Sequence, residues 1–330
     1  MTAIRRRSFT LGRGRWSPPV ACDDAMMKVV LAGGSGALGW RLCGELAARG
    51  HEVVVLSRAP RASSYRTVRW DGTTVGPWAE ELAGSAVVNL AGELVDRRPT
   101  PGNVALLTSS RVAPTRALAA AAASLDAPVP VWLQASTLAI YGDAHEAVLT
   151  EQSPLAHEPP QMTDVARAWE AAAEGVNADR AVVLRTSIVL DRDTPALDRL
   201  AGLVRWGLGG RIASGRQWFS WVHVDDWLSV AVQALEGQGP AGDLEGVLHV
   251  TSPRPVRNAD LMQILRRVLR RPAAPPTPAW AVRAGTVLLR TDPALALTGR
   301  RAVPARLEEA GFTFEHPQLE RALEDLMRRR

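Results

Sequence analysis

This chain is poor in cysteine, tyrosine and lysine, three residue types that often carry chemistry. Its 330 residues contain two cysteines, Cys22 and Cys43, two tyrosines, Tyr65 and Tyr141, and one lysine, Lys28. Two cysteines cannot build a disulfide framework, and no Cys-x-x-Cys or Cys/His spacing predicts a metal site. We therefore expect no bound metal and a reduced, cytoplasmic compartment.

Long hydrophobic runs are also missing. No run of about 18 uncharged apolar residues occurs, so we expect no membrane span. Hydrophobic residues make up 46% of the chain and charged residues 22%, which excludes a mainly disordered protein. The length allows one large domain or two modest ones.

Positive charge is concentrated at the two ends of the chain. Residues 1–27 and the last three residues, 328–330, each carry a net charge of +3, so residues 28–327 carry −1 of the total of +5. A nucleic-acid-binding protein would carry its basic excess as a patch on the folded body. We therefore expect no nucleic-acid partner.

Residues 1–26 contain a twin-arginine pattern, but no apolar stretch follows it, and we expect a disordered basic tail rather than an export signal.

Short apolar strands alternate with helices from residue 28 onward. Strands are predicted at 28–32, 52–56, 68–71, 85–90, 130–135, 180–184 and 247–250, and helices at 37–49, 109–123, 164–175 and 222–235. Continuous apolar strands between helices indicate a parallel sheet that is covered on both faces. The predicted fold class is α/β, a doubly wound parallel sheet of the Rossmann type with a smaller α/β C-terminal part.

A glycine-rich loop lies between the first strand and the first helix. Glycines at 33, 36 and 39 suit a tight turn, a close approach of the backbone to a pyrophosphate, and helix–strand packing. After the second strand come Ser57 and Arg58, where NAD-binding chains place a carboxylate for the ribose hydroxyls. A guanidinium suits a 2′-phosphate, so we predict NADP(H) in preference to NAD(H).

Five segments resemble those of the extended short-chain dehydrogenase/reductases: residues 32–39, 89–92, 136–142, 184–190 and 221–226. The stretches 89–93, 149–151, 169–170 and 214–221 are similar to YfcH-like proteins of the NAD-dependent epimerase family, and residues 252–326 resemble the small C-terminal domain of that group. The resemblance implies an epimerase or oxidoreductase. It implies no particular substrate.

The resemblance also implies a Tyr-x-x-x-Lys pair, which moves a proton while the nicotinamide moves a hydride. In that pattern a Glu follows four residues after the Lys. Glu170 fits this place, which puts Ala166 at the Lys position and Met162 at the Tyr position. Tyr65 has an arginine four residues later, but both follow the second strand on the adenosine side. We therefore predict an atypical active site.

The candidate catalytic residues are Thr137, which the resemblance places at the active-site Ser/Thr position, and Tyr141. Each has a structural alternative, a strand-end hydroxyl bonded to backbone for Thr137 and a packing role for Tyr141. His145 and His223 are further titratable candidates, and His223 is also suited to bonding the backbone where the two parts join. The predicted substrate pocket is a polar and aromatic group that domain packing would also explain: Glu93, Gln217, Trp218, Ser220 and Trp221.

The predicted division of the chain is a tail at 1–26, an NADP(H)-binding domain at 27–190 with its sheet completed within 222–251, and a substrate part at 191–330. Residues predicted to bind the cofactor follow the carboxyl ends of the strands: Gly33, Ser35, Gly36, Ala37, Leu38, Gly39, Ser57, Arg58, Asp71, Leu90, Ala91, Gly92, Arg111, Ser136, Arg185 and Ser187. Two functions stay open, an NADP(H)-dependent enzyme acting on an unknown small molecule and a non-catalytic NADPH-binding regulator linked to cell division or redox state. The oligomeric state, monomer or homodimer, also stays open.

Overall fold

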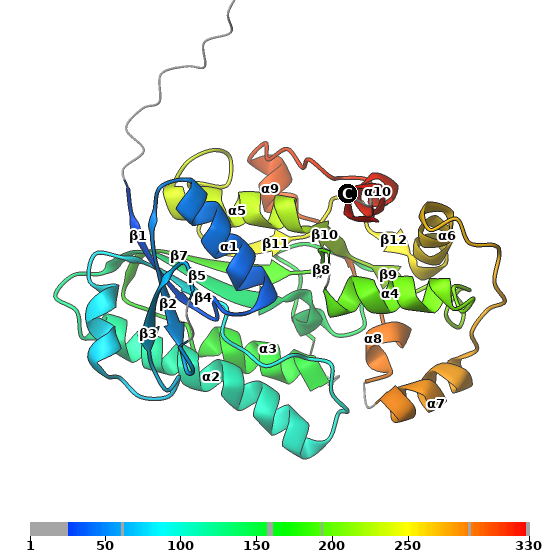
Figure 1. Cartoon of the computed structure of the whole chain (residues 1–330), viewed down its shortest axis with the longest axis horizontal. Helices are drawn as coiled ribbons and strands as arrows, with labels where there is room; N and C mark the ends of the chain where they lie inside the picture. The colour runs from blue at the N-terminus through cyan, green and yellow to red at the C-terminus, as the bar shows by residue number, and fades with distance from the viewer. Residues whose placement is uncertain (1–25, 61–62, 157–160, 193, 290–291, 328–330) are drawn as a thin grey trace, which may run out of the picture.

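A seven-stranded parallel sheet forms the centre of the molecule (Figure 1). The structure is a computed structural model that describes residues 26–60, 63–156, 161–192, 194–289 and 292–327. The strand order is β11-β7-β5-β4-β1-β2-β3, and every neighbouring pair is parallel. Its strands are β1 (Lys28–Ala32), β2 (Glu52–Ser57), β3 (Arg66–Arg69), β4 (Ala86–Asn89), β5 (Val129–Thr137), β7 (Ala178–Thr186) and β11 (Gly246–Val250).

Helices cover both faces of this sheet. In Figure 1, α1 (Ala37–Ala48) and α5 (Val224–Glu236) lie on one face, and α2 (Pro101–Ala123) and α3 (Gln161–Ala171) on the other. The middle strands are buried on both sides; for example, Val53 to Leu56 are each at most 6% exposed. Two apolar cores result, one on each face. This arrangement explains why the strands are continuous runs of β-branched residues rather than alternating ones.

The C-terminal part is built of short elements around a third apolar core. Three small two-stranded pairs join distant segments: β8 (Ile188–Leu190) with β10 (Trp221–His223), β9 (Trp218–Phe219) with β12 (Val256–Arg257), and β6 (Val148–Leu149) with β13 (Arg301–Ala302). The helices here are α4 (Pro195–Arg205), α6 (Asn258–Val268), α7 (Ala279–Leu289), α8 (Ala294–Leu297), α9 (Ala305–Glu309) and α10 (Leu319–Met327). The 3₁₀ helices η1 (Pro77–Leu82) and η2 (Leu138–Tyr141) belong to the sheet half.

Helix boundaries are where the sequence predictions were least accurate. The helix predicted at 109–123 begins at Pro101, because the Thr100 side chain accepts the Asn103 N–H and a proline suits the first turn. The helix predicted from Val222 begins at Val224. Residues before it form strand β10, and His223 caps the helix.

The basic tail predicted at 1–26 lies almost wholly outside the described residues. The division into domains stays a prediction. Among the helices that the structure describes, none is long and apolar enough to cross a membrane.

Candidate functional site

The glycine loop lies where the chain order of the sheet reverses, between β1 and β4. Gly33 has a φ of +86°, and a Cβ there would lie 2.6 Å from the Leu90 backbone; a Cβ at Gly39 would lie 2.4 Å from the Gly33 carbonyl oxygen. Both positions therefore require glycine. Gly36 differs, since its Cβ would meet only the Gly33 carbonyl, at 3.4 Å. Its open side faces the space that a ligand would fill.

Helix α1 begins directly after this loop and has no side-chain cap. Its N-cap is Gly36, and its first turn holds no acidic residue. The N–H groups and the positive end of the helix dipole thus stay available to an anion. Ser35 and Ala37, which flank Gly36, are exposed at the same place, whereas Leu38 is only half-buried. The predicted residues of this loop are brought together as expected for a pyrophosphate site.

Arg58 lies just past the carboxyl end of β2, beside the loop. Its side chain is 71% exposed, and its one ion pair among the described residues is with Glu93, whose Oε1 lies 3.5 Å from Arg58 Nη2. Ser57 accepts the Ala59 N–H. Asp71, also predicted to meet the cofactor, accepts the Thr74 hydroxyl and the N–H groups of Thr74 and Thr73, and these bonds lower the pKa of its carboxyl.

Glu93 was predicted to line the substrate pocket, and this stays a prediction, because the structure shows only the partners of its carboxylate. It pairs with Arg58 and, at 3.1 Å, with Arg97, on the β2 side of the crevice. Arg111 holds the backbone of this turn, because its Nη2 donates to the Glu93 carbonyl at 2.9 Å and its Nη1 to the Leu107 carbonyl at 3.1 Å. Burial lowers the pKa of Arg111 to about 10. The Arg111 side chain thus packs against the Leu90–Ala91–Gly92 turn.

The end of β5 carries a buried polar network. Ser136 donates to Glu170, and Glu170 receives Arg185 Nε at 2.9 Å and Nη2 at 2.7 Å. Arg185 Nη1 donates to the Tyr141 hydroxyl at 2.6 Å, and that hydroxyl lies 2.7 Å from His249 Nε2. Ser136 and Arg185 are at most 6% exposed. Both were predicted to meet the cofactor; in the structure they hold each other and Tyr141 in place.

The side chain of Tyr141 is therefore buried in this network rather than exposed to a ligand. It is 4% exposed, and burial raises the pKa of its hydroxyl. Its partner His249 donates from Nδ1 to the Val303 carbonyl at 3.0 Å, and burial lowers the pKa of His249 to about 4. The imidazole is thus neutral, and its Nε2 accepts a hydrogen bond from the Tyr141 hydroxyl. This arrangement favours the structural alternative for Tyr141.

Thr137 is different. It is half-buried, and its hydroxyl accepts the Ala139 N–H at 3.2 Å. Within the described part of the chain, this hydroxyl donates its own proton to no protein acceptor. Of the two predicted catalytic residues, Thr137 is thus the one whose hydroxyl proton is available to a ligand. Ser187, further along, instead donates to the Val250 carbonyl.

Apolar side chains occupy the two positions where the resemblance implies a Tyr-x-x-x-Lys pair. Met162 is 7% exposed and Ala166 is fully buried, both on α3. Lys28 lies at the start of β1 and pairs with Glu81 at 2.6 Å. Tyr65 packs its ring edge-on against Trp40, with centroids 5.1 Å apart. Neither the lysine nor this tyrosine lies at the carboxyl end of β5.

The polar and aromatic group at 217–221 divides in two. Trp221 is fully buried and Ser220 is 7% exposed, with its hydroxyl bonded to the Arg300 carbonyl and the Ala302 N–H. Their burial and hydrogen bonds favour the packing alternative, and their place in a substrate pocket stays a prediction. Gln217 donates to the carbonyls of Ile212 and Ala296.

Trp218 keeps part of its surface exposed. Two guanidinium groups lie over its ring, with the Cζ of Arg257 at 4.0 Å and that of Arg301 at 4.6 Å from the centroid, and its Nε1 donates to Glu146. It remains a candidate for the substrate side.

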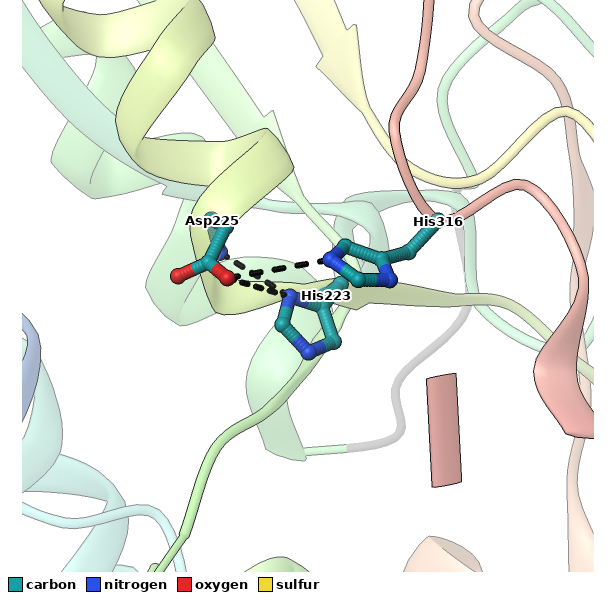
Figure 2. A group of neighbouring side chains, drawn as sticks. All are labelled: His223, Asp225 and His316. Atoms are coloured by element: carbon teal, nitrogen blue, oxygen red, sulfur yellow. Dashed lines mark hydrogen bonds and ion pairs between the residues drawn. The ribbon is translucent and has the colours of Figure 1, made fainter. Parts of the chain in front are cut away.

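Figure 2 shows a cluster that ties the C-terminal segment to helix α5: His223, Asp225 and His316. His223 Nδ1 accepts the Asp225 N–H at 3.2 Å, and its ring stacks on His316 with centroids 3.8 Å apart. Burial and the neighbouring His316 lower the pKa of His223. One ligand atom from each residue lies within 4.8 Å of the others. His223 Nδ1 is engaged by the Asp225 N–H, whereas His223 Nε2 is buried and has no hydrogen-bond partner among the described residues. His223 thus caps helix α5, and its stacking on His316 joins this helix to the C-terminal segment. A bond of His223 to the backbone was predicted. His145, the other histidine candidate, is exposed beside Asp143.

Sequence reasoning missed His249, Arg300 and His316. They reach their places across long stretches of chain; Tyr141 and His249, for example, are 108 residues apart. No spacing rule connects such positions. The buried acceptor role of Glu170 was also missed, although its place in the motif had been recognised.

The reversal of strand order, the glycine loop and the uncapped helix define a Rossmann-fold protein of the class that binds dinucleotides at such a point. The chain belongs to the NAD dependent epimerase/dehydratase family, which it matches over residues 29–244; residues 277–326 match a domain of unknown function, DUF1731. The predicted family and fold class are thereby confirmed.

Similar proteins extend over nearly the whole chain. The bovine epimerase family protein SDR39U1 is 34% identical, covering 91% of this chain and 100% of its own length. A chloroplastic homologue of SDR39U1 from Arabidopsis thaliana is 31% identical, covering 97% and 93%.

Two solved structures have the same fold. The human SDR39U1 structure with NADPH is 32% identical, with a TM-score of 0.79, and covers 91% of this chain and 99% of its own. A nucleoside-diphosphate sugar epimerase from Corynebacterium glutamicum is 28% identical, with a TM-score of 0.72, covering 92% and 59%.

Proposed function

We propose that this protein binds NADP(H) at the reversal between β1 and β4 and uses it in an epimerase or oxidoreductase reaction. The observation that carries the proposal is the glycine loop, where Gly36 leaves an open side in front of an uncapped helix. A pyrophosphate fits this cradle, since backbone N–H groups and the helix dipole both favour an anion. NADPH in the structure of the human relative supports the same choice.

Arg58 would select the phosphorylated cofactor. It lies at the end of β2 with most of its guanidinium exposed, at the place where NAD-binding chains use a carboxylate. A guanidinium fork matches a phosphate group, whereas a carboxylate would repel it. When bound, NADP(H) supplies hydride transfer.

Thr137 is the residue that we assign to the substrate. Among the described residues its hydroxyl donates its proton to no protein acceptor, and it lies at the carboxyl end of β5. It would hydrogen-bond a carbonyl or hydroxyl oxygen and orient a water molecule as the proton source. Tyr141 is bound to Arg185 and His249 and would keep η2 in position behind it.

A second function, a non-catalytic NADPH-binding regulator, has one observation in its favour. The positions of the family's proton-transfer pair hold buried Met162 and Ala166, and Lys28 pairs with Glu81 instead. A protein with this site would bind the cofactor and leave it unchanged.

Turnover decides between the two functions. NADPH consumption would be followed by absorbance with aldehydes, ketones and nucleotide sugars for wild type, Thr137→Ala and the matched control Thr137→Ser. An enzyme should lose roughly 10²–10⁴ in rate in the alanine variant and keep most of it in the serine variant, which retains the hydroxyl. Tight NADPH binding without consumption by wild type would favour the regulator. Fast turnover that survives Thr137→Ala would place the chemistry on another residue.

A further inference from the structure

Large apolar side chains project into solvent where helix α4 ends and helix α7 begins. Trp206, the residue that follows α4, is 86% exposed, and Trp280 in the first turn of α7 is 72% exposed. Leu208, just beyond Trp206, is 56% exposed. Single exposed apolar residues are ordinary on a protein surface, whereas a group of them marks a place of contact with something apolar.

Backbone contacts hold the two ends of these helices together. The Arg211 carbonyl receives the Thr277 N–H at 2.9 Å, and the Thr277 carbonyl receives the Ala213 N–H at 2.8 Å. Gly210 lies so close to the Pro275 carbonyl that no Cβ would fit there. The loop after α4 is therefore fixed beside the segment that leads into α7, and both helices lie at the same end of the molecule (Figure 1).

Helix α7 turns an apolar stripe outward. Trp280, Arg283, Ala284 and Val287 are all exposed, and their spacing of three and four residues places them on one side of the helix. Val287 is 63% exposed, whereas Thr286 is buried. The apolar side of a helix normally packs on the protein core, so an outward stripe indicates a contact outside the folded chain.

The charge of this region is of one sign. Residues 199–224 and 261–291 contain ten arginines and no aspartate or glutamate. Three of these arginines pair with carboxylates of other segments: Arg199, Arg216 and Arg267. Five are exposed and have no ion pair among the described residues: Arg205, Arg211, Arg270, Arg271 and Arg283. The small net charge of residues 28–327 thus conceals a basic surface.

We propose that this surface binds an anionic lipid bilayer, so that the protein lies on the membrane without spanning it. The surface consists of Arg205, Trp206, Leu208, Trp280, Arg283 and Val287. Indole rings favour the boundary between lipid headgroups and acyl chains, and arginines beside them attract negatively charged headgroups. The aliphatic side chains favour a bilayer over nucleic acid, because bases offer stacking to tryptophan but no apolar layer to leucine or valine.

Co-sedimentation of the full chain with vesicles tests the role of the charges. Wild type should bind vesicles of phosphatidylcholine mixed with phosphatidylglycerol, bind phosphatidylcholine alone far more weakly, and lose affinity as salt rises. Each arginine near an anionic membrane contributes about fivefold in affinity, so Arg205→Gln with Arg283→Gln should weaken binding by more than about tenfold. The matched control is Arg69→Gln with Arg116→Gln, two exposed arginines on β3 and α2.

Tryptophan fluorescence tests the contact with the apolar layer. Bromine-labelled lipids should quench wild type, and most of this quenching should be lost in Trp206→Ser with Trp280→Ser, which should also bind the vesicles at least about tenfold more weakly. Trp40→Ser is the control, since Trp40 is 49% exposed on α1, and it should be quenched as wild type is. The Tm of the double tryptophan variant without lipid should equal that of wild type, because both rings are exposed.

Four results would overturn the proposal. Wild type could bind neither kind of vesicle, or bind both equally well. The double tryptophan variant could bind and be quenched as wild type is, or unfold at a lower Tm, which would show that the two rings pack within the protein. Retention of wild type on DNA or polyglutamate without binding to vesicles would assign the basic surface to another class of partner and refute the proposal as well.

Discussion

Cofactor preference depends on one exposed side chain. Arg58 extends from the end of β2 with 71% of its side chain exposed, 3.5 Å from a Glu93 oxygen. That carboxylate is shared with Arg97, so it does not neutralise Arg58 fully. A 2′-phosphate would replace Glu93 as the partner of Arg58. We therefore expect Arg58→Ala to remove the preference for NADPH over NADH.

The expected loss of NADPH affinity in Arg58→Ala follows from the exposure of the Arg58 side chain. A hydrogen bond to a charged group contributes about 1.5–3 kcal/mol, while an exposed ion pair contributes about 0–1 kcal/mol. Arg58 is largely exposed, so its contact with the phosphate should contribute an energy between these two ranges, at about 1.4 kcal/mol. This corresponds to about tenfold in Kd. Glu93→Gln should act in the opposite sense and tighten NADPH a few fold, because it removes a like charge from beside the phosphate.

Fluorescence titration with both cofactors, at low and at high salt, measures these effects. The salt dependence of NADPH binding should weaken in Arg58→Ala, since fewer charges are then involved. Arg49→Ala is the control, because Arg49 is an arginine with exposed surface at the end of α1, paired with Glu45 and Glu236. Equal affinity of wild type for NADPH and NADH, or an unchanged preference in Arg58→Ala, would refute the reasoning.

Three further predictions concern the loop and the buried network. Gly36→Val should abolish NADPH binding in calorimetry while unfolding stays cooperative, because its Cβ meets only one backbone oxygen; stoichiometric binding would contradict this. His249 has a pKa of about 4 when folded against 6.5 otherwise, so the unfolded chain takes up its proton first. The free energy of unfolding should then fall by up to about 3 kcal/mol from pH 6.5 to 4 in urea titrations, and His249→Gln should flatten that slope. Tyr141→Phe should cost about 1–3 kcal/mol of stability but leave turnover per folded molecule unchanged; a rate loss without destabilisation would make Tyr141 catalytic.

The sheet and its glycine loop could be predicted because their signals are local. A strand buried on both faces must be continuously apolar, and a turn against a neighbouring backbone must be glycine, as Gly33 and Gly39 show. Each signal lies within a few consecutive residues. The starts of the helices were harder to predict, since Thr100 and His223 act as caps through single hydrogen bonds that many sequences could form.

The side chains of the candidate site depended on packing between distant segments. Trp218 and Trp221 are three positions apart and chemically alike, yet Trp218 is half-buried in contact with two arginines and Trp221 is fully buried. Tyr141 is held by His249, Gly299 donates its N–H to Asp143 and Arg300 donates its N–H to Trp218, through contacts that span the chain. Periodicity records which face of an element is apolar, but it carries no information on which face of another element will meet it. The partners and the burial of these side chains are therefore decided only when distant segments of the chain pack together.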